Sequence, residues 1–179
     1  SPVADKGRLV YLLRKYREYF LSLSTDNKFY KLYSEADEIY RNDIADYTLI
    51  NNVCEKISEA EIYPFEIKSY YSESAGGKSG RFIYDGGTLK TVTLTKKYGG
   101  VTNVRLYAAI YDNSDEVKSV TTYPVTDDGN EIILETEFET VLEGGYIKLF
   151  LMAEDMEPAA KSLMIKPWEK NDVFSDTAV

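Results

Sequence analysis

The stretch ISEAEIYPFEIKSYYS, residues 57–72, divides the chain into two halves with different secondary-structure signals. Before it, apolar residues recur at the spacing of an amphipathic helix, and Ile57 and Ala60 are the last of them. Pro64 cannot easily continue a helix, because its ring removes a backbone donor and clashes with the preceding turn. After Pro64 the apolar residues alternate weakly, which is typical of a strand. The sequence therefore predicts two modules, at residues 1–63 and 64–179.

Three amphipathic helices are predicted in the first module. They cover residues 6–23, residues 27–41 after a capping stretch at 24–27, and a third segment that begins after Asp46. Three such helices with short links predict an antiparallel three-helix bundle. The predicted inward positions are Leu9, Leu12, Leu13, Tyr16, Phe20 and Leu23, then Phe29, Leu32, Tyr33, Ala36, Ile39 and Tyr40, then Ile50, Val53, Cys54, Ile57 and Ala60.

The second module is predicted to be β-structure. Residues 73–80 form an expected flexible loop, which is either a hinge or an ordered turn within the sheets. Seven or eight strands at the observed spacing predict a sandwich, so the expected fold class is α+β, a three-helix bundle followed by an antiparallel immunoglobulin-like β-sandwich. The strands are expected at residues 64–72, 88–98, 102–112, 116–123, 131–142, 145–153 and 161–166.

The composition argues against several kinds of chemistry. The chain has no histidine, which rules out histidine-dependent triads and histidine metal sites. Its net charge is −9 and its cationic residues are scattered, so nucleic-acid binding is not expected. Cys54 is the only cysteine, which excludes an intramolecular disulfide. No apolar run reaches the roughly 18 residues of a spanning helix, so membrane insertion is not expected either.

The first module resembles FIVAR modules, which are three-helix repeats of large bacterial surface proteins and glycan-active enzymes. The usual pattern opens the second helix with Thr-x-x-x-Trp, and Phe29 stands where that Trp would be. The third helix usually opens with Thr-Gln-x-x-Val, where this chain has Asp46 as the cap and Ile50 as the apolar residue. The resemblance covers roughly residues 5–62 and is carried by residues 5–9 (DKGRL), residues 25–32 (TDNKFYKL), Ala36, Ile50, Val53, Ile57 and Ala60.

The second module resembles a β-sandwich module that is common at the ends of Firmicute surface proteins. The similar segments are residues 104–112 (VRLYAAIYD), 117–120 (VKSV), 146–152 (YIKLFLM) and 156–158 (MEP), within roughly residues 88–166. Met152 replaces the Trp of the usual pattern. This resemblance implies a fold more than a function. Together the two resemblances imply a location outside the cell or on its surface.

The candidate ligand-binding residues are aromatic. Alternation places Tyr107 and Tyr111 on the strand face opposite the row from Val104 to Ile110, and it places Phe150 on a similar face of strand 145–153. If that face is open, its rings can stack on the apolar faces of sugar rings, and Trp168 is a further candidate. The alternative is that the opposite sheet, the helical bundle or a neighbouring module covers the aromatic row, and that Trp168 closes the end of the sandwich.

Four other features have simpler interpretations. The loop at 112–116 (DNSDE) carries oxygen ligands but lacks the glycine and closing Glu of an EF-hand, which favours a solvated turn over a calcium site. Residues 76–80 (GGKSG) lack the first glycine and the following helix of a phosphate loop. Glu135, Glu137 and Glu139 alternate as solvent-facing residues do, although paired acids can serve a glycosidase. Cys54 has no histidine to activate it.

Two functions remain open, and neither involves a catalytic residue, a metal or a cofactor. The first is a non-catalytic structural or adhesive spacer in a secreted or cell-surface bacterial protein, with neighbouring modules as partners. The alternative is a carbohydrate-binding module of a glycan-degrading multimodular protein, with a polysaccharide or cell-wall glycan as ligand. Two or more coplanar exposed rings among Tyr107, Tyr111, Phe150 and Trp168 would favour binding, and their complete burial would favour the spacer. An enzyme would instead need a concave pocket that holds two acids.

Overall fold

The computed structural model describes residues 5–80, 82–126 and 129–167. It contains two compact units, and each has its own hydrophobic core. The helical unit comprises Ser1–Ile62 with Tyr98–Gly100, and the two-sheet unit comprises Tyr63–Lys97 with Val101–Val179. Within the described ranges, every helix is too short or too polar to cross a membrane.

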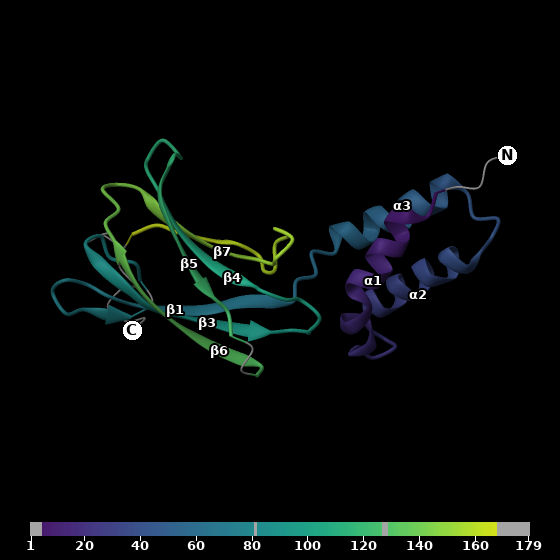
Figure 1. Ribbon diagram of the computed structural model, residues 1–179, viewed down its shortest axis with the longest axis horizontal. Helices are drawn as coiled ribbons and strands as arrows, with labels where there is room; N and C mark the ends of the chain where they lie inside the picture. Colours follow the sequence, from purple (N-terminus) through teal and green to yellow (C-terminus); the bar gives the residue numbers. More distant parts are fainter. Residues whose placement is uncertain (1–4, 81, 127–128, 168–179) are drawn as a thin grey trace. The chain divides into compact units, whose positions relative to one another are not determined.

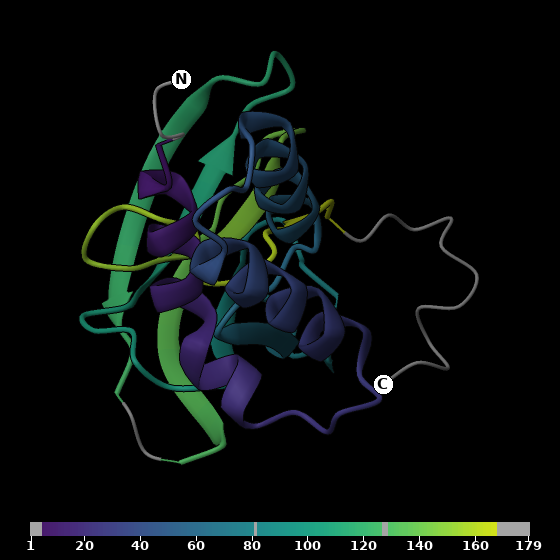
Figure 2. The same cartoon turned by 90° about the vertical axis from the view of Figure 1, so that its right-hand side faces the viewer.

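The helical unit consists of α1 (Gly7–Leu21), α2 (Lys28–Arg41) and α3 (Tyr47–Glu59), which pack against one another (Figure 2). The predicted caps of the second and third helices are confirmed. The Asn27 side chain accepts a hydrogen bond from the Phe29 N–H at 2.8 Å, and the Asp46 side chain accepts one from the Leu49 N–H at 2.8 Å. Each cap satisfies a backbone donor that has no partner within its helix.

The core of the helical unit follows the predicted apolar stripes, with one exception. Tyr40 was expected to face inward, but 43% of its surface is exposed. It lies in the last turn of α2, where the Lys6 ammonium sits over its ring and donates hydrogen bonds to the Tyr40 and Asn42 carbonyls at 2.8 and 2.7 Å. The buried residues are Leu9, Leu12, Leu13, Tyr16, Phe29, Tyr33, Ala36, Ala45, Ile50, Val53, Cys54 and Ile57.

The two-sheet unit has two antiparallel four-stranded sheets whose apolar faces share one core (Figure 1). The first sheet has the order β2-β1-β3-β6 and the second has the order β5-β4-β7-β8. Alternation explains the core: in β6 every second residue is buried, and in β4 Leu106, Ala108 and Ile110 point inward. The strands are β1 (Phe65–Glu73), β2 (Ser79–Gly80), β3 (Gly87–Lys96), β4 (Arg105–Tyr111), β5 (Val117–Pro124), β6 (Glu131–Thr140), β7 (Tyr146–Met152) and β8 (Leu163–Ile165).

Residues 73–80 form an ordered turn within the first sheet, which decides between the two expectations for this loop. Ser72 pairs with Gly80 and Glu73 pairs with Ser79, so the loop returns as the short strand β2. The Ser74 N–H also donates to the Lys78 carbonyl at 2.7 Å. No helix follows the Gly-Lys-Ser triplet among the described residues, because the chain continues into β3.

Phe65 and Pro167 lie near opposite ends of β1. The unit's first strand begins at Phe65, whose N–H donates to the Ala159 carbonyl. The last described residue, Pro167, bridges to Ile83. Ile83 follows Phe82, whose carbonyl accepts a hydrogen bond from Ser72 near the far end of β1. Seven residues of β1 separate the two ends, a distance of about 23 Å along the strand.

Candidate functional site

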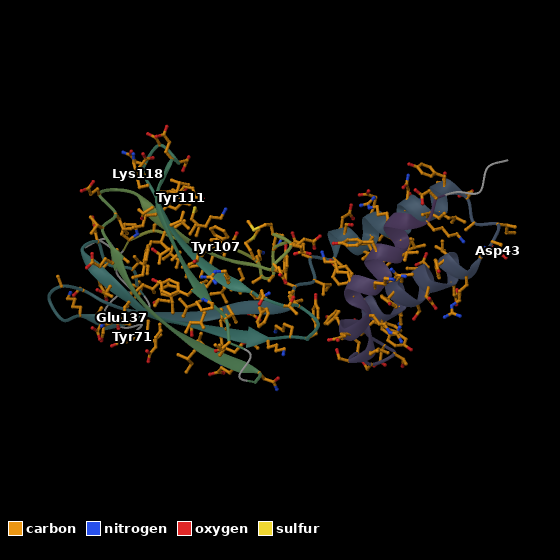
Figure 3. The ribbon with its side chains drawn as sticks, in the orientation of Figure 1. Asp43, Tyr71, Tyr107, Tyr111, Lys118 and Glu137 are labelled. Atoms are coloured by element: carbon orange, nitrogen blue, oxygen red, sulfur yellow. The ribbon has the colours of Figure 1, made fainter. Side chains whose placement is uncertain are left out.

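The outer face of the second sheet brings together three of the four predicted ligand-binding residues. The pairing of β4 with β7 sets Tyr107 opposite Phe150 and Tyr111 opposite Tyr146. In Figure 3, Tyr107 and Tyr111 follow one another along β4, and Tyr111 lies nearer the hairpin that carries Lys118. We call this surface the aromatic face. It comprises Arg105, Tyr107, Ala109 and Tyr111 of β4, Tyr146, Lys148, Phe150 and Met152 of β7, and their neighbours Val117, Val120, Thr122 and Met164.

The aromatic rings form two parallel pairs across the strands. The centroids of Tyr107 and Phe150 are 5.1 Å apart with ring planes 7° from parallel, and those of Tyr111 and Tyr146 are 5.2 Å apart with planes 4° from parallel. Parallel rings at this separation are offset-stacked rather than side by side in one plane. One face of each ring is therefore occupied by its partner, which leaves the other face and the ring edge.

These rings are neither fully exposed nor fully buried. Tyr107, Tyr111, Tyr146 and Phe150 are all partly exposed. They are parallel but not coplanar, so they do not make the flat platform that would directly favour sugar stacking. They also lack the complete burial that would favour a purely structural role. The arrangement of the rows between and around them therefore decides what the face can bind.

A row without aromatic residues separates the two ring pairs. It runs across the sheet from Val120 through Ala109 and Lys148 to Met164. Ala109 is only 1% exposed, whereas Val120 and Met164 at the two ends are 48% and 57% exposed. Lys148 therefore lies in the row between the two ring pairs.

The cations of the aromatic face have no carboxylate partner. Across the described ranges, neither Arg105 nor Lys148 forms an ion pair. Arg105 Nη2 donates a hydrogen bond to Thr122 Oγ1 at 3.0 Å. No strand position of this face is Asp or Glu. In a chain of net charge −9, this is an unusual local excess of positive charge.

The outer face of the first sheet has the opposite character. Its lysines are paired: Lys68 with Glu131, Lys90 with Glu137 and Lys97 with Glu66, each at 2.9 Å. Glu135, Glu137 and Glu139 are exposed while the residues between them are buried, so the prediction that they face solvent is confirmed. Figure 3 shows Glu137 and Tyr71 on this sheet.

The β4–β5 hairpin uses its acidic residues to hold its own backbone. Asp112 Oδ1 accepts hydrogen bonds from the Ser114 and Glu116 N–H groups at 2.8 and 2.9 Å, and Oδ2 lies 3.2 Å from Lys118 Nζ. These contacts hold the pKa of Asp112 below its ordinary value, and the hydrogen bond from the Glu116 N–H has the largest effect. In the described part of the chain no group of three His, Cys, Asp or Glu side chains could hold a metal ion.

The hairpin also fixes one ring of the aromatic face. The Tyr146 hydroxyl donates to Asp115 Oδ1 at 2.9 Å. This hydrogen bond to the Asp115 carboxylate is the main cause that raises the pKa of Tyr146. Tyr146 is thus held at one end of the face, beside its stacking partner Tyr111.

Two further candidates, Trp168 and Cys54, and two residues that were not predicted complete the comparison with the sequence. Trp168 lies outside the described residues. The Cys54 side chain is fully buried, and this burial raises the pKa of its thiol, which favours a core role over a nucleophilic one. Tyr146 and Lys148 were not among the predicted site residues, although alternation along 145–153 already placed both on the same face as Phe150.

Comparisons with known proteins add no family assignment. The resemblance to FIVAR modules therefore stays a prediction. No protein-family model matches the chain, and no curated protein matches it significantly in sequence.

Proposed function

We propose that the chain is a non-catalytic structural or adhesive spacer, a pair of modules within a secreted or cell-surface bacterial protein. The observation that carries the proposal is that Phe65 and Pro167, in the described part of the two-sheet unit, lie near opposite ends of β1. Attachment at two opposite ends would let the unit add length between neighbouring modules.

The strand order supports an immunoglobulin-like topology for this unit. In such folds strands A, B and E share one sheet, and strands C and F with G share the other, to which C′ can be added beside C. Taking β1, β3 and β6 as A, B and E, and β4, β5, β7 and β8 as C, C′, F and G, reproduces both observed orders. The short β2 is then an addition to the edge beside β1.

The helical unit supports the FIVAR-like part of the proposal through Phe29. This residue, which stands where the family pattern has Trp, is 6% exposed. Its ring contacts those of Tyr16 and Tyr19, with centroids 5.6 and 5.2 Å away. An aromatic residue at this position therefore has the core role that a Trp would have.

The positions of Phe65 and Pro167 also predict mechanical resistance. Pulling on Phe65 and Pro167 draws β1 along β3 in shear, so the ladder of hydrogen bonds from Phe65–Lys96 to Glu73–Thr88 is loaded together. The described residues of the helical unit form three helices and no ladder of paired strands. We therefore expect the two-sheet unit to unfold at a clearly higher force than the helical unit.

Single-molecule force spectroscopy tests the spacer proposal. The full chain carries Cys54→Ser and is held through new cysteines at its two ends. Two unfolding steps are expected, the larger extension coming at the higher force. A two-sheet unit that opens at the lower force would contradict the predicted mechanical resistance, and turnover of a glycan or peptide by the purified chain would overturn the non-catalytic spacer proposal.

A second function, carbohydrate binding by the two-sheet unit, is favoured by a separate observation. The aromatic face carries four partly exposed rings on adjacent strands and two unpaired cations.

A further inference from the structure

The aromatic face is an ordered ladder of alternating rows. Along β4 and β7 the rows are Tyr111 with Tyr146, then Ala109 with Lys148, then Tyr107 with Phe150, then Arg105 with Met152. Successive rows are two residues apart, about 7 Å, so the whole ladder extends over about 20 Å. A ring pair and a cation alternate twice over this length.

We propose that this ladder binds an acidic polysaccharide, with sugar carboxylates at Lys148 and Arg105 and sugar rings against the two aromatic pairs. The proposal makes the carbohydrate-binding function specific to anionic glycans and assigns it to named residues. It rests on that second function and is independent of the spacer function.

The positive charges of Lys148 and Arg105 indicate that the ligand is an anion. Lys148 and Arg105 lie two rows apart, about 13 Å along the strands, with the Tyr107–Phe150 pair between them. Neither has a carboxylate partner among the residues that the structure describes, and no Asp or Glu occupies a strand position of the face. A ligand that supplies carboxylates there forms charge-assisted hydrogen bonds that the protein itself does not make.

The rings suit the same ligand. Their inner faces are filled by stacking, and the partial exposure of all four rings leaves part of their outer faces and edges open to a ligand. Aromatic edges carry positive partial charge and attract carboxylate and hydroxyl oxygens, while the outer faces accept C–H groups of a sugar ring. The tyrosine hydroxyls add hydrogen-bonding groups at the rim of the face.

Two other classes of partner fit the face less well. A protein interface would have to bury Lys148 at its centre, where lysine is generally depleted. A nucleic acid needs many cations for its phosphates and flat aromatic faces for its bases. This face offers two strand cations, and its rings already stack on each other.

The test uses the full chain and polygalacturonate as the probe, with the methyl-esterified polymer as the uncharged match. Isothermal titration calorimetry with oligomers of each measures affinity at low and high salt. We expect binding of the acid form, weakened by salt because exposed ion pairs are screened, and weak or no binding of the ester. Alginate and hyaluronan oligomers extend the test to other uronic acids.

Matched variants locate the site. Lys148→Gln and Arg105→Gln are each expected to weaken binding roughly tenfold or more. Lys68→Gln, which removes the same charge from the first sheet, is expected to leave it unchanged. Thermal melting checks that each variant is folded, and Phe150→Leu tests the ring contribution separately.

Several results would overturn the proposal. These are no binding of any uronic-acid oligomer by the folded chain, or unchanged binding by the Lys148 and Arg105 variants. Equal binding of the methyl ester would keep carbohydrate binding but remove the acidic class. Equal binding of polyglutamate would indicate an acidic protein partner instead, and self-association that Lys148→Gln abolishes would indicate a second copy. None of these results alters the force experiment, so the two functions fail separately.

Discussion

Gly145 lies next to the aromatic face, at a position where the fold leaves no room for a side chain. A Cβ atom at this position would lie 1.9 Å from the Tyr111 carbonyl oxygen, so the ends of β4 and β7 would have to separate. We expect Gly145→Ala to lower the free energy of unfolding of the two-sheet unit by about 2–3 kcal/mol, measured by urea denaturation with circular dichroism.

Gly76→Ala is the matched control for this prediction. Its nearest atom would be 3.9 Å from the new Cβ, and we expect a change within about 0.5 kcal/mol. If both variants unfold at the same urea concentration as the unchanged chain, close approach is not the reason for glycine at position 145.

At the residue scale, the sequence predicts on which face of a strand a side chain lies, but not which side chains contact one another. Alternation was enough to place Tyr107, Tyr111 and Phe150 on outer faces, because side chains of a strand point alternately to its two sides. It could not predict that Tyr111 stacks on Tyr146, since that depends on the register of two strands. Nor could it predict the Lys6 hydrogen bonds to carbonyls 34 and 36 positions away, which exist only once α1 and α2 pack.

The β4–β5 hairpin is the element whose stability should depend on acid. The hydrogen bonds to Asp112 favour its ionised form, so its pKa is lower in the folded state than in the unfolded chain. This stabilisation is complete above the unfolded value of 3.8 and is lost as the pH falls through the folded value. We expect Asp112→Asn to lower the melting temperature near neutral pH and to reduce its decrease between about pH 4.5 and pH 2.

Glu116→Gln is the control in the same hairpin, because its exposed side chain makes no contact of this kind with the turn. We expect its melting temperature to follow that of the unchanged chain over the acid range, as recorded by scanning calorimetry. An Asp112→Asn variant with the full acid dependence of the unchanged chain would mean that other carboxylates cause it.

At the element scale, hydrophobic periodicity predicted all three helices and the seven longer strands, within a few residues at each end. Strand pairing was not predictable. The turns at 112–116 (DNSDE) and 143–145 (EGG) both consist of residues that favour turns or solvent, yet the first joins neighbours within one sheet and the second joins β6 and β7 of different sheets. Turn residues permit both connections, and the shared core selects between them.

The whole molecule should unfold in two steps, because each unit closes around its own core. We expect scanning calorimetry to resolve two transitions. Leu12 is 6% exposed, and we expect Leu12→Ala to lower the free energy of unfolding of the helical unit alone by about 2–5 kcal/mol. Leu149 is 0% exposed, and we expect Leu149→Ala to lower the free energy of unfolding of the two-sheet unit alone by a similar amount. A single transition that both variants shift equally would show that the units unfold together.

The change of pattern at residues 57–72 was sufficient to predict two modules, because a proline and a change of periodicity coincide there. Tyr98–Gly100 clusters with the helical unit although it lies between β3 and β4. No local pattern marks these residues, since their grouping depends on the folded chain.

The buried thiol of Cys54 has a consequence if the proposed cell-surface location holds. It is the only thiol in the chain, and its side chain is fully enclosed while α1, α2 and α3 are folded. If the protein carries load at a cell surface, the thiol meets solvent only in copies whose helices have been pulled apart. A maleimide dye that cannot enter cells would then mark those copies alone. The labelled fraction would then report how many copies have had their helical unit pulled open, without any engineered sensor.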